Sequence, residues 1–67
     1  MANQKGHMDD IAKAHRNTAR HTIVDEANKV SRVRRFTMKS IREAVHFARQ
    51  NNLVRDEVYV SAGFNPQ

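Results

Sequence analysis

Four side chains that can carry positive charge recur at helical spacing in the middle of the chain. Lys39, Arg42, His46 and Arg49 are separated by three, four and three residues, so in a helix they share one flank. The row spans about 15 Å of helix rise, which lets it follow a phosphate backbone or enter a major groove. We call it the first basic row and predict that it binds nucleic acid.

Two further groups of cations extend this pattern. Three arginines precede the first basic row and add charge near its start: Arg32, Arg34 and Arg35. A second basic row, spaced by three and four residues, lies upstream: Lys13, Arg16 and Arg20. We expect nucleic-acid contacts from the first basic row and the three arginines, with the second basic row secondary. A charged row can also be only a solvated helix face.

Residues suited to catalysis or metal binding are sparse. The sequence has no cysteine and no glycine-rich phosphate loop, and no two of its four histidines lie three or four residues apart. Asp9–Asp10 and Asp25–Glu26 are adjacent pairs, so their side chains diverge by about 100° on a helix. We therefore expect no enzyme, no cofactor, no metal site and no small-molecule substrate.

Composition narrows the class of protein and of partner. The chain has 67 residues and a net charge of +5, so it forms at most one domain with a marginal core, and its charge favours a polyanionic partner. Without cysteine, helix packing and oligomerisation are the remaining sources of stability. The absence of a long apolar run, signal peptide or strongly apolar helix face predicts a cytoplasmic or nucleoid-associated protein without membrane binding.

The basic rows require helices to position them, and residues 8–35 provide the longest. Their apolar residues keep one helical phase: Met8, Ile11, Ala12, Ala19, Ile23, Ala27, Val30 and Val33. This pattern predicts one helix of roughly 42 Å, with His15 and Glu26 interrupting its apolar stripe. The alternative is two helices, with Thr22 capping the second. The unbroken phase favours the single helix.

The second half of the sequence predicts a shorter helix and a strand. Thr37 suits an N-cap, and Phe36 and Ile41 occupy hydrophobic-staple positions. The helix should run from about 38 to 50 and stop at Asn51–Asn52, because asparagine tolerates the left-handed cap. The β-branched and aromatic residues of 57–61 predict a short strand. The predicted fold is mostly all-α, a long helix and a short antiparallel helix forming a hairpin, with a C-terminal strand. Residues 1–7 are expected to be a disordered leader, 8–62 one domain and 63–67 a tail.

Helix lengths predict a homodimer. A helix of about 13 residues is about 20 Å long and covers only half of the longer one, and a lone strand needs a pairing edge. Phe47 lies about 120° from the apolar stripe of its helix, where a neighbour could contact it. The predicted interface combines these uncovered positions: Met8, Ile11, Ala12, Ala19, Phe47, Val58, Tyr59 and Val60.

Two segments resemble parts of DNA-binding folds. Residues 34–44, with a basic pair, an apolar residue and a threonine cap after a long helix, resemble the second loop and third helix of histone-fold proteins. That likeness implies a DNA contact by Arg34. Residues 40–60 resemble the recognition helix and wing of winged-helix proteins, which implies that the long helix is split near His21.

We hypothesise a small dimeric DNA-binding protein, acting as a transcriptional regulator or in DNA architecture. The alternative is a protein-interaction module, such as a small phage- or plasmid-type inhibitor or adaptor that docks on an acidic host protein. In that alternative, the strand at Val58–Val60 would extend a partner's sheet.

Overall fold

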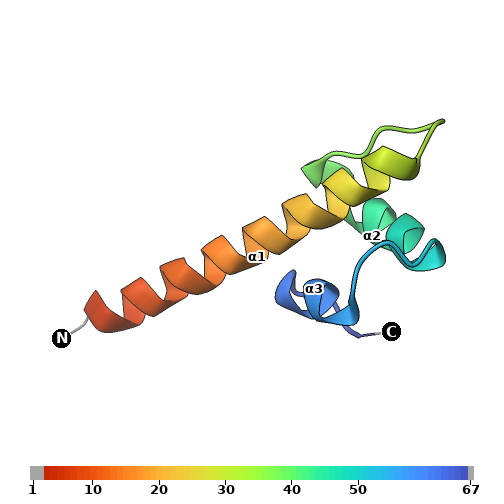
Figure 1. Ribbon diagram of the computed structural model, residues 1–67. Helices are drawn as coiled ribbons and strands as arrows, with labels where there is room; N and C mark the ends of the chain where they lie inside the picture. Colours follow the sequence, from red (N-terminus) through yellow and green to blue (C-terminus); the bar gives the residue numbers. More distant parts are fainter. Residues whose placement is uncertain (1–2, 67) are drawn as a thin grey trace.

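The computed structural model describes residues 3–66, and side chains from residue 10 onward. In this part of the chain the order is α1 (Asn3–Val30), the 3₁₀ turn η1 (Met38–Ser40), α2 (Ile41–Gln50) and α3 (Asp56–Ser61) (Figure 1). The predicted helical class is confirmed, and α2 packs against α1 as a hairpin requires. No helix among the described residues is long and apolar enough to cross a lipid bilayer.

α1 is one unbroken helix, as the continuous apolar phase predicts. The hydroxyls of Thr18 and Thr22 donate to the carbonyls of Ala14 and Thr18, each at 3.0 Å. Thr22 therefore bonds within α1 and caps no second helix. The helix begins at Asn3, inside the segment 1–7 that the sequence predicts as a leader; residues 1–2 lie outside the described residues.

α1 ends at Val30, five residues before the predicted end at Arg35. The Ser31 hydroxyl donates to the Arg34 carbonyl at 2.6 Å and accepts from the Arg34 amide at 3.2 Å. These bonds give the backbone an alternative to another helical turn. Val33, predicted to continue the apolar stripe, is 99% exposed in the resulting loop, 31–37.

The predicted second helix is present, with its first turn wound as η1. The Thr37 amide donates to the Ser40 hydroxyl at 2.9 Å, which secures the start. The helix stops where the asparagine pair predicts: Asn52 has a left-handed φ of 53°, and the Leu53 amide returns to the Ala48 carbonyl at 3.0 Å.

The predicted strand at 57–61 is wrong, because these residues form α3. Tyr59 and Ala62 are 2% and 0% exposed, and their spacing of three places both on one helical face. A strand would need a pairing edge, and the described residues contain none. The winged-helix resemblance fails for the same reason, and because α1 is not split.

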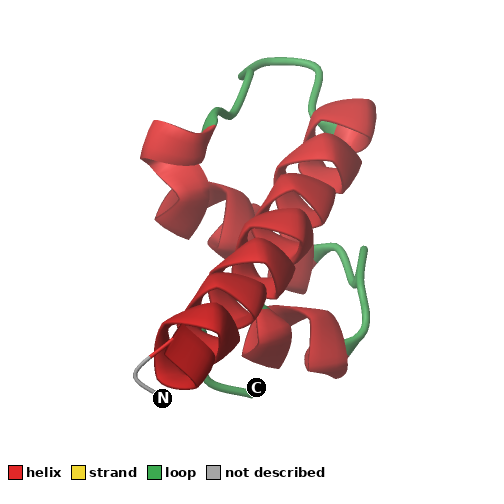
Figure 2. Cartoon of the chain, turned by 90° about the vertical axis from the view of Figure 1, so that its left-hand side faces the viewer, coloured by secondary structure: helices red, strands yellow, loops and turns green. Residues whose placement is uncertain are grey.

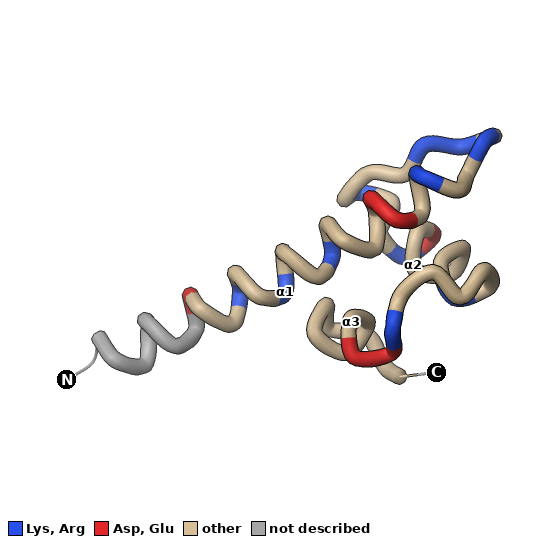
Figure 3. Tube along the Cα trace, viewed as in Figure 1, with Lys and Arg blue, Asp and Glu red and all other residues tan. Residues whose placement is uncertain are grey.

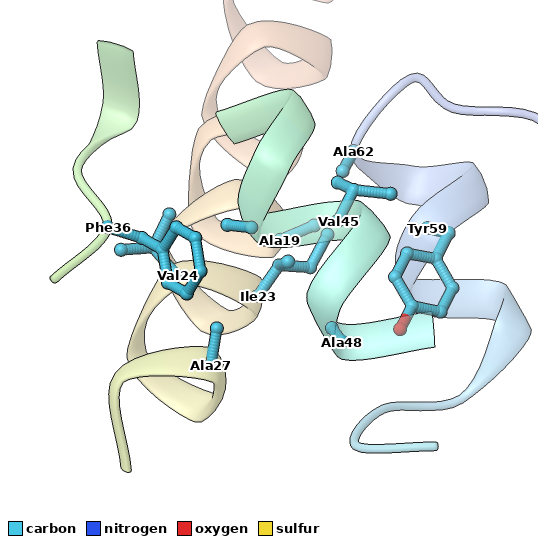
Figure 4. Packing of buried hydrophobic residues seen from close by; sticks show 10 residues of the cluster. Ala19, Ile23, Val24, Ala27, Phe36, Val45, Ala48, Tyr59 and Ala62 are labelled. Carbon is cyan, nitrogen blue, oxygen red and sulfur yellow. The ribbon is translucent and has the colours of Figure 1, made fainter. Parts of the chain in front are cut away.

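The core lies where α2, α3 and the loop meet the C-terminal half of α1 (Figure 4). Its buried members are Ala19, Ile23, Val24, Ala27, Phe36, Ala44, Val45, Ala48, Tyr59 and Ala62. Five are alanines, which permit close approach of the helices. The N-terminal half of α1 extends beyond this core (Figure 1) and lies in front of the other helices in Figure 2.

Candidate nucleic-acid interface

The structure divides the first basic row into exposed and occupied members. Lys39 in η1 and Arg42 and His46 in α2 are exposed, whereas Arg49 is half-buried. The Arg49 guanidinium lies 4.7 Å from the ring centre of Tyr59, and its Nη2 donates to the Asn65 carbonyl. The predicted phosphate contact by Arg49 therefore does not fit, because this side chain holds the C-terminal segment.

The arginines before η1 lie on the exposed loop 31–37 (Figure 3). Arg34 pairs with Glu43 and lies 5.4 Å from the ring centre of Phe36. Arg32 and Arg35 have no ion pair among the described residues. The structure thus distinguishes Arg34, which already has an acidic partner, from Arg32 and Arg35, which have none among the described residues.

The loop that carries these arginines is fixed by hydrogen bonds. The Asn28 amide group donates to the Phe36 carbonyl at 2.9 Å, and its oxygen accepts from the Phe36 amide at 2.8 Å. Phe36 itself is 5% exposed. With the Ser31 bonds to Arg34, these contacts anchor the loop at both ends while Arg32 and Arg35 stay in solvent.

We define the basic surface as the exposed lysine and arginine residues of the loop, η1 and α2 that lack an ion pair among the described residues. Its members are Arg32, Arg35, Lys39 and Arg42. They occur within eleven residues of sequence, and all lie on segments that pack against the end of α1.

A groove of about 450 Å³ separates the loop from the outer face of α2. Phe36 and Phe47 line it, with ring centres 5.4 Å apart, and Arg42 and His46 stand at its edge. Phe47, predicted to face a neighbouring subunit, is half-buried against Phe36 of its own chain. The 120° offset from the stripe of α2 therefore points Phe47 toward the loop.

The second basic row is also divided. Lys13 and Arg16 are exposed, but Arg20 is half-buried. Arg20 Nε donates to the Ala62 carbonyl at 2.8 Å, and its guanidinium lies 5.4 Å from the ring centre of Phe64. Arg20 and Arg49 thus bind the C-terminal segment from two helices. The sequence signal for this docking is the pair of aromatics, Tyr59 and Phe64.

Tyr59 is structural in this arrangement. Burial raises the pKa of its hydroxyl, Arg49 acts in the opposite direction, and Asp56 adds to the rise. The Tyr59 hydroxyl and Arg49 Nε are buried and have no hydrogen-bond partner among the described residues. The phenol therefore stays protonated at neutral pH and offers no nucleophile or base.

Two residues of the predicted dimer interface are not available to a partner. Ala19 and Tyr59 are wrong as interface residues, because both are buried in the core of their own chain. Ile11 and Val60 are 42% and 52% exposed. Of the other predicted members, Ala12 is exposed and Val58 half-buried; the side chain of Met8 lies outside the described residues.

Among the side chains that the structure describes, no three His, Asp or Glu residues gather as metal ligands would. Comparison with known proteins adds no assignment: no family model, curated protein or solved structure matches the chain.

Proposed function

We propose that the chain binds duplex DNA through the basic surface, as a transcriptional regulator or DNA-architectural protein. The supporting observation is that the four cations of this surface are exposed and lack ion pairs among the described residues, on a loop fixed by hydrogen bonds. Exposed, unpaired lysines and arginines that contact phosphates displace the counterions condensed on DNA. This release supplies most of the non-specific affinity of a DNA-binding protein.

The fixed backbone is what makes this surface suited to binding. A free loop with three arginines would lose conformational entropy on meeting DNA, and that loss lowers affinity. Here Asn28 and Ser31 have already restricted the loop in the free protein. Lys39 and Arg42 stand on helical segments and need only side-chain ordering.

Arg34 has a different place in this proposal. Its pairing with Glu43 and its stacking on Phe36 orient it within the loop. DNA contact by Arg34 would require the ion pair to open, and an exposed ion pair of this kind is worth at most about 1 kcal/mol. We therefore treat Arg34 as a weaker contributor than Arg32 or Arg35.

The test is fluorescence anisotropy with a labelled 20-base-pair duplex and alanine variants of the four cations. Each lost phosphate contact should weaken binding about eightfold at 0.1 M salt. Arg55→Ala is the matched control, because it removes one exposed arginine outside the basic surface. Equal losses for Arg55→Ala and Arg42→Ala would contradict the assigned surface and indicate binding by net charge alone.

A second candidate function is docking on an acidic protein. The fully exposed Val33 stands between arginines beside the groove lined by Phe36 and Phe47, which combines apolar and basic contacts. Recovery of one acidic protein at constant stoichiometry after nuclease treatment, together with no duplex binding, would favour this candidate. The strand-addition version of it is excluded, since Val58–Val60 belongs to α3.

We also propose that the DNA-binding form is a homodimer. Ile11 and Val60 remain exposed after the chain has folded, and every described residue of α1 from Asp10 to Thr18 is exposed. Closed twofold assemblies are the commonest way in which a small protein covers such surface.

A further inference from the structure

The chain exposes more surface than a compact monomer of its mass. A folded 7.7 kDa protein should expose about 4,300 Å², whereas this one exposes 5397 Å². Its radius of gyration is 13.6 Å, against about 10.9 Å for a compact domain of 67 residues. The excess area, about 1,100 Å², exceeds the roughly 800 Å² that each partner contributes to a standard interface.

The uncovered surface lies mainly on α1. Packing against α2, α3 and the loop buries α1 residues only from Ala19 onward, and the described residues before Ala19 are all exposed. Helices in proteins owe most of their stability to tertiary packing of one face. The N-terminal half of α1 lacks such packing within its own chain (Figure 1).

A groove at the base of this projecting half can receive a second helix. It has a volume of about 460 Å³ and lies between α1 and α3. Most of its lining side chains are small, and only His15 and Glu57 are larger. The small ones are Ala14, Thr18, Ala19 and Thr22 from α1, with Val58 and Ser61 from α3. Small side chains allow two helix axes to approach to about 8 Å.

The threonines in this groove can be buried at little cost. Their hydroxyls already donate to carbonyls of α1. A helix that covered the threonines would therefore leave neither hydroxyl without a hydrogen-bond acceptor. Ile11 lies four residues before His15, and Thr18 and Thr22 continue the same stripe along α1. An exposed apolar side chain and a groove of small residues thus share one face of the same helix.

The charge distribution at this face disfavours a polyanionic partner and is compatible with a second copy of the chain. The cations of the second basic row lie about 160° away around α1, and the charged residue that lines the groove is Glu57. DNA or an acidic protein would therefore be drawn to the opposite side. On α1 this stripe carries no Asp, Glu, Lys or Arg. It presents both an apolar side chain and a groove, so two copies can cover each other as a twofold interface requires.

We infer that two copies pair through this face, each placing the N-terminal half of α1 antiparallel in the α1–α3 groove of the other. In this register, Ile11 of one protomer meets Thr18 and Val58 of its partner, and the twofold axis passes near His15. This inference rests on the homodimer proposed above and names its interface. It leaves the basic surface of each protomer free.

Sedimentation equilibrium of the full chain in DNA-free buffer tests the inference. The wild type should approach twice 7.7 kDa with rising concentration. Thr18→Lys should raise the dimer dissociation constant at least about tenfold, because it places a charge in the interface. Asn17→Lys is the matched control, since it adds the same charge to the neighbouring exposed residue, about 130° from the groove. Circular dichroism checks that both variants fold.

Cysteine cross-linking then tests the register. The natural chain has no cysteine, so any disulfide comes from the introduced residue. Oxidised His15→Cys should run as a covalent dimer, and Asn17→Cys should remain mostly monomeric. A wild type that stays at 7.7 kDa throughout, or equal effects of the paired variants, would overturn the inference. DNA affinity is measured separately, so its failure would leave this result unchanged.

Discussion

The side chain of Asn28 makes two hydrogen bonds to the backbone of Phe36, one to its carbonyl at 2.9 Å and one from its amide at 2.8 Å. This pairing joins the last turns of α1 to the far end of the arginine-bearing loop. It also holds Phe36 in the core, where only 5% of the residue is exposed. Asn28 thereby anchors the far end of the loop that carries Arg32 and Arg35 of the basic surface.

The first prediction concerns this pairing. Asn28→Ala should lower the free energy of unfolding by about 1–3 kcal/mol, because two part-buried backbone groups lose their partner. Urea denaturation measures the change. Asn17→Ala, an exposed asparagine on the same helix, should stay within about 0.5 kcal/mol of the wild type. Equal stability of the two variants would show that the Asn28 bonds do not hold the loop.

The second prediction separates Arg49 from Arg42. Arg49→Ala should lower the free energy of unfolding by about 1–2 kcal/mol, since it removes the stacking on Tyr59 and the bond to Asn65. Its DNA affinity, measured where the variant is fully folded, should match the wild type. Arg42→Ala should do the reverse, weakening DNA binding without loss of stability. A large loss of DNA affinity in Arg49→Ala would show that Arg49 contacts DNA together with the other members of the first basic row.

The third prediction uses the raised pKa of Tyr59. Folding favours the neutral phenol, so the stabilisation is complete below the unfolded pKa of about 10 and is lost as pH rises through the folded pKa. The wild type should therefore lose thermal stability above about pH 10 more steeply than Tyr59→Phe, which has no phenol to ionise.

At neutral pH, Tyr59→Phe should be as stable as the wild type or more stable, because the buried hydroxyl has no partner among the described residues. Melting temperatures from pH 7 to 11 measure both effects. Parallel pH profiles for the two proteins would mean that the phenol is not desolvated in the folded state.

The helices could be predicted where local signals and apolar periodicity agree. The unbroken phase gave α1, and Thr37 with Asn52 marked the ends of the shorter helical segment. The end of α1 could not be read in this way, because it depends on hydrogen bonds that form only in the folded loop, between Ser31 and Arg34 and between Asn28 and Phe36. The spacing of apolar residues extended the predicted helix past its true end, because it included Val33, which is exposed in the structure.

Residues 57–61 show the limit of composition. Val58, Tyr59 and Val60 favour a strand locally. The described residues contain no strand with which such a strand could pair, and a helix at these positions buries Tyr59 in the core. Docking of the C-terminal segment also occupies Arg20 and Arg49, which donate hydrogen bonds to its carbonyls and are therefore not free as the predicted basic rows require. The sequence spacing identified which cations could share a helix face. It could not show that two of them contact the C-terminal segment, because that depends on how this segment docks in the folded chain.

The most direct test of the proposed function is the salt dependence of duplex binding by the wild type and by a variant with all four basic-surface cations replaced by alanine. Four phosphate contacts per protomer predict a slope of log affinity against log salt of about −3.6 for the wild type when one protomer of the dimer contacts the duplex, and of about −7.2 when both do. The fourfold variant keeps Arg34, so its slope should fall to about −1 or closer to zero, and circular dichroism should show that the variant keeps its fold. An unchanged slope in the variant, or no binding by the wild type at 50 mM salt, would contradict the proposal that this surface binds DNA.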